Sequence, residues 1–444
     1  MKGVYRENNM PDNQIKPFGR FLMLWAGDFY ANTASGLSAF ALAIFMFEMT
    51  GKVTSVALTA LSAFLPAMLL NPLAGVLADR FDRRLMMILG DGCSALGLLY
   101  ILLCMMTGRV GEWQIYLGVG ISSGFTALLE PSYKATITDL LTKEQFAKAS
   151  GLVQAAGSAK FLLSPLIAGF LLTITDIRTV LIIDISTIAV TLPITMFIKK
   201  QIVSNRIASV KTESDKQSFF RELAEGWRTI SANKGLLWMI VLISTVTFYV
   251  GFLQTLFTPM MIAISDIKTL GMVESVSAAG MLIGSLILGV CTVTRKYVNQ
   301  LVTALVSAGL FIALLGVTSN VFVIAVCAFL FFTSLPFANT SADVLIRATI
   351  PGEKQGRAWG LIGALSQFGY AAAYAVSGVL ADHVFNPLLR ENGALSSTIG
   401  RITGVGEGRG IALMLIVSGA LLVVSAFIMG KIPSIRVLEE ALSI

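Results

Sequence analysis

Long apolar runs recur along the whole chain and constrain its fold more than any single motif. A helix needs about 20 mostly apolar residues to cross the hydrocarbon core of a bilayer. Charged residues make up only 13% of the 444 residues, whereas about a quarter is usual in soluble domains. Candidate membrane spans lie at residues 21–47, 53–77, 85–107, 112–133, 152–175, 177–198, 236–264, 271–293, 298–318, 320–342, 357–382 and 410–430. The sequence therefore predicts an all-α polytopic membrane protein with twelve transmembrane helices.

The connectors between these spans alternate in charge. Those after the even-numbered spans are basic, such as DRFDRR and PGEKQGR, and those after the odd-numbered spans are nearly neutral. Because basic residues favour the cytoplasmic side of a membrane, we expect both termini and the basic connectors in the cytoplasm and the chain in the cell (inner or plasma) membrane. This topology also accounts for the net charge of +7, so a nucleic-acid partner is not needed to explain it.

A polar segment divides the spans into two sets of six. Its later part places Phe219, Leu223, Trp227 and Ile230 at helical spacing, which predicts an amphipathic helix on the membrane surface, or alternatively a solvated linker helix. TKEQFAKASGL (142–152) and PGEKQGRAWGL (351–361) align residue by residue after spans four and ten, which indicates a duplication and two pseudo-symmetric six-helix bundles. The predicted organisation is a cytoplasmic tail at 1–20, bundles at 21–198 and 236–430, a linker at 199–235 and a second tail at 431–444.

The connector after span two, GVLADRFDRR (75–84), is unusually rich in charge. Gly75 allows another helix to approach closely, and Asp79 lies where the span leaves the bilayer. Arg83 follows about one turn later, within reach of that acid. The basic residues could simply hold the loop in the cytoplasm.

This stretch resembles the G-x-x-x-D-R-x-x-R-R/K signature of the major facilitator superfamily. The match falls on Gly75, Asp79, Arg80, Arg83 and Arg84. The resemblance implies a twelve-helix transporter in which this cluster, joined by Asp91, latches the cytoplasmic ends of the halves in the outward-facing state. It also implies that the acid lies near the start of span eleven. EPSYKATITDLLTKEQFAKASGL and GVLADHVFNPLL are similar to the branch that includes macrolide-efflux and siderophore-export proteins.

Ionisable residues inside the predicted spans are candidates for function, since a charge at the bilayer centre costs about 2.5–3.5 kcal/mol. Asp28, with Tyr30 and Asn32 nearby, lies in the most polar stretch of any span. It could bind a proton, a cationic substrate or each in turn, or be a buried acid satisfied by hydroxyl groups. Lys160 of span five could pair with Asp28 or with Asp184 of span six, and helix packing is the favoured role of Asp184.

Span five contains GSAKFLLSPLIAG, which is similar to a G-x-x-x-G-P motif of superfamily antiporters. Ser164 stands where the second glycine belongs, and Pro165 and Gly169 are kept. The resemblance implies close packing of this span on a helix of the second half, which the small serine permits. The basic residue that many proton antiporters carry in span four is missing.

The sequence favours a secondary transporter over other classes of membrane protein. It has no P-loop, no nucleophile–base pair and no metal-ligand spacing, so neither ATP hydrolysis, another enzymatic activity, a cofactor nor a metal site is predicted. We expect proton-coupled efflux of amphipathic or hydrophobic, macrolide-like compounds by a monomer, with the substrate, protons and lipid as its partners. Export of siderophores or lipids and import of a nutrient are the alternatives.

Overall fold

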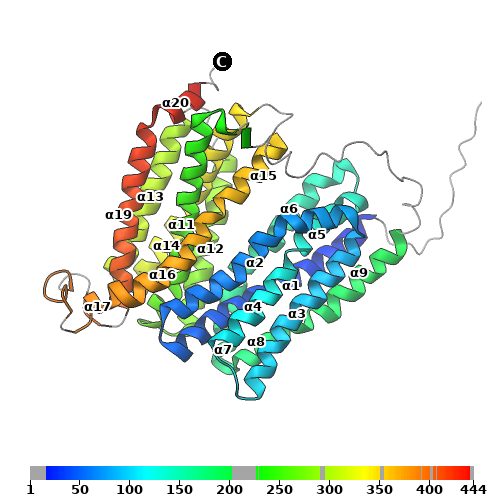
Figure 1. The fold of residues 1–444 in the computed structure, drawn as a ribbon, viewed down its shortest axis with the longest axis horizontal. Helices are drawn as coiled ribbons and strands as arrows, with labels where there is room; N and C mark the ends of the chain where they lie inside the picture. Colours follow the sequence, from blue (N-terminus) through cyan, green and yellow to red (C-terminus); the bar gives the residue numbers. More distant parts are fainter. Residues whose placement is uncertain are drawn as a thin grey trace, which may run out of the picture.

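The computed structural model describes residues 17–202, 227–228, 230–290, 296–350, 355–391, 393–400, 404–406 and 408–440, and helices are the only regular elements in these ranges (Figure 1). Most of the predicted linker, including Phe219 and Leu223, lies outside them. So do most of the predicted N-terminal tail and residues 351–354 of the second repeat segment. The backbone of Asp79 is described, but its side chain lies outside the description.

The first half of the chain forms one bundle. Its helices are α1 (Pro17–Thr50), α2 (Val53–Arg80), α3 (Arg83–Met106), α4 (Glu112–Thr126), α5 (Leu129–Leu140), α6 (Phe146–Leu162), α7 (Ser164–Ile174), α8 (Ile177–Ser186) and α9 (Ile188–Ile202). Two of the interruptions have a clear cause in proline. Pro131 has no N–H to donate to the carbonyl of Ala127, and the helix breaks there between α4 and α5. Pro165 occupies the first turn of α7, directly after the break at Leu163.

The second half forms the other bundle. Its helices are α11 (Lys234–Ile262), α12 (Ile267–Val290), α13 (Tyr297–Val317), α14 (Val321–Thr349), α15 (Gln355–Ser366), α16 (Phe368–Leu380), the π-helical turn η4 (Ala381–Phe385), α17 (Asn386–Leu388), α19 (Arg409–Lys431) and α20 (Pro433–Glu440). Helix α20 lies within the predicted C-terminal tail. Its Ile435 and Leu438 are buried in the core of this bundle, so this part of the tail is a packed helix.

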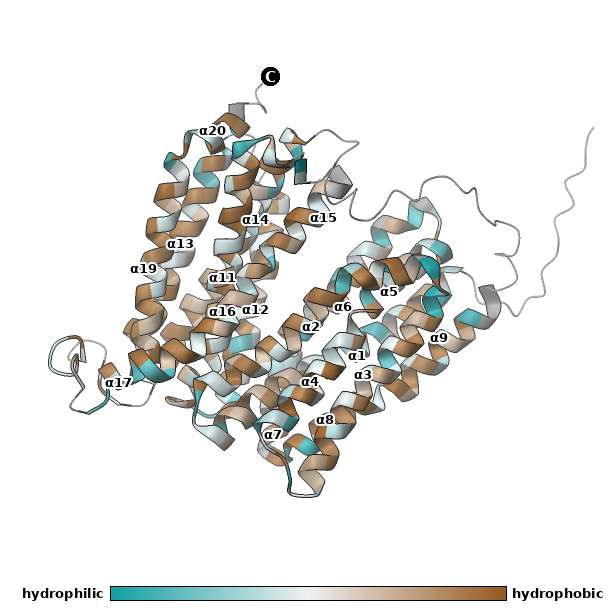
Figure 2. Cartoon of the chain, in the orientation of Figure 1, coloured by the Kyte–Doolittle hydropathy of each residue, from teal (hydrophilic) through white to brown (hydrophobic). Residues whose placement is uncertain are grey.

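Ten helical stretches of the described chain are long and apolar enough to cross a membrane, and two of them consist of consecutive helices, α6 with α7 and α8 with α9. The other two predicted spans, 112–133 and 357–382, are also divided between consecutive helices, α4 with α5 and α15 with α16. Hydrophobic residues occur along most of the length of the helices (Figure 2). Large apolar side chains face outward, for example Leu96, Leu286 and Phe427 at 57%, 68% and 54% exposure. An apolar outer surface of this kind suits contact with lipid.

The two bundles touch at one end and diverge toward the other, where the C-terminus lies (Figure 1). We call the diverging end the basic end, because the Arg80–Arg84 connector lies there, and the other the closed end. One hydrophobic core runs through both halves and includes Leu37, Ile101, Leu256 and Phe331. A separate core in each half lies toward the basic end, around Phe21 in the first half and Leu345 in the second. The halves therefore share a core only away from the basic end.

Two helix pairs make most of the contact between the bundles. Helix α7 packs on α12, and α2 packs on α16. At the first pair a Cβ on Gly271 would meet the carbonyl oxygen of Pro165 at 2.2 Å, and one on Gly169 would meet the carbonyl oxygen of Ile267 at 3.0 Å. Glycine is required here because the two backbones lie in contact.

Candidate functional site

Asp28 lies on α1 and borders a small cavity inside the first bundle. The cavity has a volume of ≈ 60 Å³ and lies among α1, α3, α5 and α9. Asn32, one turn along α1, donates a hydrogen bond from its side-chain amide to the backbone carbonyl of Asp28 at 3.0 Å. The cavity is lined by Leu24, Gly27, Asp28, Ala31, Met87, Asp91, Leu129, Tyr133, Thr191, Ile194 and Thr195.

Asp91 of α3 lines this same cavity, and its carboxylate accepts a hydrogen bond from the hydroxyl of Thr191 on α9. In this conformation Asp91 therefore lies apart from the charged connector that it was predicted to join. Asp91 follows Arg84 by seven residues, which is about 10 Å along a helix, and its side chain turns into the bundle instead. The structure thus brings together Asp28 and Asp91, a pair that the sequence alone did not suggest.

The cavity combines two acids with buried hydroxyl groups. Tyr133 is 6% exposed, and its hydroxyl has no hydrogen-bond partner within bonding distance but interacts electrostatically with Asp28. None of the lining residues is basic. Two carboxylates in an apolar cavity repel each other, and a proton or another cation held between them relieves that repulsion. The chemistry of the site is therefore that of a cation or proton acceptor.

Lys160 and Asp184 form a second group of buried charges in the first half. Asp184 of α8 is 8% exposed, and Lys160 of α6 is half-buried. Of the two partners predicted for Lys160, Asp184 is the one with which it interacts electrostatically. The pair is not in direct contact, and each group instead offsets part of the cost of burying the other.

Tyr30 lies outside the cavity lining. Its ring is 37% exposed, and its hydroxyl is 3.4 Å from that of Ser186 on α8. Ser164 is fully buried and donates a hydrogen bond to the backbone carbonyl of Thr33 at 2.7 Å. A Cβ on Gly36 would lie 2.4 Å from the Ser164 hydroxyl oxygen. Ser164 therefore ties the start of α7 to α1 at a point of close approach.

The charged connector after α2 has a partner that the sequence did not reveal. Arg83 donates to the Asp139 carboxylate of α5 at 2.9 Å and to the carbonyl of Ala135 at 3.0 Å, and Arg84 reaches the other Asp139 oxygen at 3.5 Å. Asp82 caps α3 by accepting from the backbone N–H of Arg84, and Arg80 is exposed. In this conformation the two arginines bind within the first half. Any contact made by the Asp79 side chain lies outside the described part of the molecule.

Other acids near the basic end have local partners. Glu130 pairs with Lys134 and Asp343 pairs with Arg347, each at 2.6 Å and four residues apart. Both pairs are exposed, so they contribute little to stability.

Glu274 of α12 is an intramembrane acid that the sequence reasoning missed. It is half-buried and accepts a hydrogen bond from the hydroxyl of Thr258 on α11 at 3.3 Å. The sequence does indicate this acid, since GMVESVSAAG places one carboxylate inside an apolar span.

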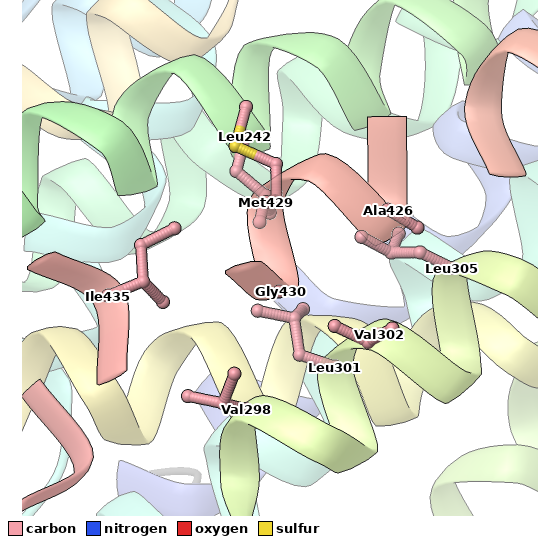
Figure 3. A pocket seen from close by; sticks show the side chains of 9 residues that line it. All are labelled: Leu242, Val298, Leu301, Val302, Leu305, Ala426, Met429, Gly430 and Ile435. Atoms are coloured by element: carbon pink, nitrogen blue, oxygen red, sulfur yellow. The ribbon is translucent and has the colours of Figure 1, made fainter. Parts of the chain in front are cut away.

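A second hollow lies among α11, α13, α19 and α20 toward the basic end (Figure 3). It has no room for a water molecule, and the side chains around it are all apolar. We interpret it as an imperfection in packing. It is lined by Leu242, Val298, Leu301, Val302, Leu305, Ala426, Met429, Gly430 and Ile435.

The chain resembles curated transporters over most of its length. It is 25% identical over 378 residues to macrolide efflux protein A of Streptococcus pyogenes, with 82% of this chain and 90% of that protein covered. It is 26% identical over 318 residues to macrolide efflux protein A of Enterococcus faecalis, with 69% and 94% covered.

Solved transporter structures share its fold. A point mutant of the nucleoside transporter NupG superposes with a TM-score of 0.74 at 14% identity, covering 92% of this chain and 99% of that one. A bacterial homologue of the iron transporter ferroportin, in its inward-facing state, gives a TM-score of 0.67 at 13% identity, with 94% and 99% covered. The family model of the Major Facilitator Superfamily matches residues 24–374. A multi-pass helical chain with these relatives and this two-bundle fold is a membrane transporter, and it belongs to the major facilitator superfamily.

Proposed function

We propose that this protein exports amphipathic or hydrophobic, macrolide-like compounds across the cell membrane in exchange for protons. The observation that carries the proposal is the cavity between Asp28 and Asp91, which holds two acids and no basic group. A group that binds and releases protons inside the membrane is what proton coupling requires. Protonation would neutralise one acid of the pair, and the entry of a cationic substrate would make the same site release its proton.

Alternating access requires the two bundles to close at one end while they open at the other. If the basic end faces the cytoplasm, as the charge of the connectors predicts, the bundles are joined on the outer side and diverge on the inner side. This arrangement corresponds to an inward-facing state. In the outward-facing state the basic ends would close, and Asp79 would lie at the N-terminal end of α15.

The substrate class rests on the two curated relatives described above, both of which are named macrolide efflux proteins. Identity of 25–26% over most of the chain supports a shared transport direction better than it supports a shared ligand. Export is therefore the first part of the proposal to test, and the identity of the compound is the second.

The test uses everted membrane vesicles in which the protein is the only drug exporter. Energised vesicles should take up a macrolide, and an uncoupler should abolish the uptake. Asp28→Asn should reduce this uptake by about tenfold or more because the amide cannot bind a proton at this site. Glu130→Gln is the matched control, since it neutralises an exposed acid of the same half.

Two results would contradict the proposal. Uptake that survives the uncoupler would show that transport is not coupled to protons. Full activity of Asp28→Asn would show that Asp28 is not the coupling residue. A panel of siderophores, lipids and nutrients in the same vesicles then identifies the substrate if macrolides are not transported.

A further inference from the structure

Asp382 joins the two halves at the closed end of the molecule. It lies in the π-helical turn η4 that follows α16, and its carboxylate accepts three hydrogen bonds from the first turn of α2. The donors are the backbone N–H of Val53 at 3.1 Å, the backbone N–H of Thr54 at 2.8 Å and the hydroxyl of Thr54 at 2.6 Å. The partners are 328 and 329 residues apart in the chain.

Helix α2 has no cap from its own sequence. The residue at its N-cap position is Lys52, whose side chain makes no capping hydrogen bond. The first N–H groups of a helix lack partners within that helix and carry a partial positive charge, so a carboxylate is the group that suits them best. Asp382 therefore supplies from the second half the cap that α2 lacks.

The surrounding contact is close enough to make this cap specific. A Cβ on Gly378, one turn before Asp382, would lie 2.4 Å from the Cα of Thr54. Farther along the same helix pair, the ring of Phe64 on α2 lies 5.6 Å from the rings of both Tyr370 and Tyr374 on α16. The backbones of the two helices are in contact at the closed end, and the three aromatic rings pack together farther along the pair.

The sequence around Asp382 occurs twice. Residues 75–79 and residues 378–382 both read GVLAD, and each copy lies at the C-terminal end of one member of the same helix pair, α2 and α15–α16. In this conformation the second copy is engaged, whereas a Cβ on Gly75 in the first copy would meet nothing within 4 Å. The two copies lie at opposite ends of the pair.

We propose that Gly378 and Asp382 form a lock that holds the closed end together while the basic end is open. Gly378 allows the two helices to approach closely, and Asp382 caps the N-terminus of α2. Release of this cap would let the closed end open. The lock needs no particular substrate or coupling ion.

Distance measurements between spin labels test the lock directly. In a variant without the native cysteines, one label pair on Thr138 and Lys234 reports on the basic end, and another on Arg109 and Lys268 reports on the closed end; all four residues are exposed. Asp382→Asn should shift the equilibrium by about tenfold toward the conformer that is open at the closed end, since the amide carries no charge and keeps only one of the two acceptor oxygens. Thr54→Ala should shift it in the same direction by less, because it removes one donor of three.

The matched control is Asp176→Asn. Asp176 also caps a helix at the closed end, accepting from the backbone N–H of Thr179 at 3.2 Å, but within the first half. It should leave both distance distributions unchanged.

The proposal is overturned if neither Asp382→Asn nor Thr54→Ala changes the distances, or if Asp176→Asn changes them equally. Thr54→Ala keeps the test decisive even if Asp382→Asn does not fold. Because the readout is a distance, its failure is independent of whether protons or macrolides are transported.

Discussion

The two halves share a fold but differ in what their interiors contain. The interior of the first half holds Asp28, Asp91, Lys160 and Asp184. Among the described residues, the second half holds Glu274 and an apolar and aromatic core that includes Phe252 and Phe331. The charges that the second half does carry lie mostly at its helix ends, as in the pair Asp343–Arg347.

This difference indicates that the two halves have different roles. Buried charges are costly in a bilayer and persist where they serve a function. The first half therefore carries the proposed proton or cation site, while the second half contributes close backbone packing through Gly271 and a capping carboxylate through Asp382. Three predictions test this comparison, in order of decreasing effect.

The greatest change should follow when Lys160 loses its charge. Lys160→Met leaves Asp184 buried without its nearest opposite charge, and we expect the free energy of unfolding to fall by about 3 kcal/mol. Unfolding in mixed detergent micelles measures this loss. Lys160→Met/Asp184→Asn should recover most of it, and Lys134→Met, which disrupts an exposed pair, should cost about 0.5 kcal/mol or less. A double variant no more stable than the single one would show that the two charges are independent.

A smaller effect is expected when the glycine contact between the halves is disturbed. In Gly271→Ala the new Cβ would lie 2.2 Å from the carbonyl oxygen of Pro165, which forces α12 away from α7. We expect transport to fall by about tenfold, since overpacking costs about 1–3 kcal/mol. Gly289→Ala on the same helix is the control, because its Cβ would meet nothing within 4 Å. If the two variants had equal effects, the loss of transport would not be due to the contact between Gly271 and Pro165.

The weakest effect should be seen at Glu274. Glu274→Gln keeps the shape of the side chain and the acceptor for the Thr258 hydroxyl, so transport should change by less than about twofold and keep its dependence on pH. Uptake into everted vesicles across a range of pH measures both. If this variant loses its pH dependence while Asp28→Asn keeps it, the comparison is wrong and the second half carries the coupling group.

Much of the molecule is readable in the sequence because it depends on local composition. Apolar run length predicted the spans, and the fold and family that the motif at 75–84 implied are confirmed. Asp28 and Lys160 were found because an ionisable residue stands out in an apolar run. Their proposed roles stay predictions, as do those of the charged connector and the domain boundaries.

Other features depend on contacts between distant parts of the chain, and the sequence reasoning missed or misplaced them. Asp91 was assigned to the connector because it is near in sequence, but the direction of its side chain on α3 brings it to Thr191, one hundred residues away. Asp139 is the partner of Arg83 and Arg84 because α5 packs beside the start of α3, a contact that the sequence does not show. Glu274 was overlooked although its position in the sequence was informative.

That this chain crosses a membrane repeatedly, and that it belongs to its superfamily, can be read from the sequence alone, since both follow from apolar run length and a short local motif. Which acids share a cavity and which copy of GVLAD is engaged depend on the tertiary structure. This is because the partners of a side chain are set by the packing of helices far apart in the chain. Two identical pentapeptides can therefore be in opposite states, one capping a helix of the other half and one with open space beside its glycine.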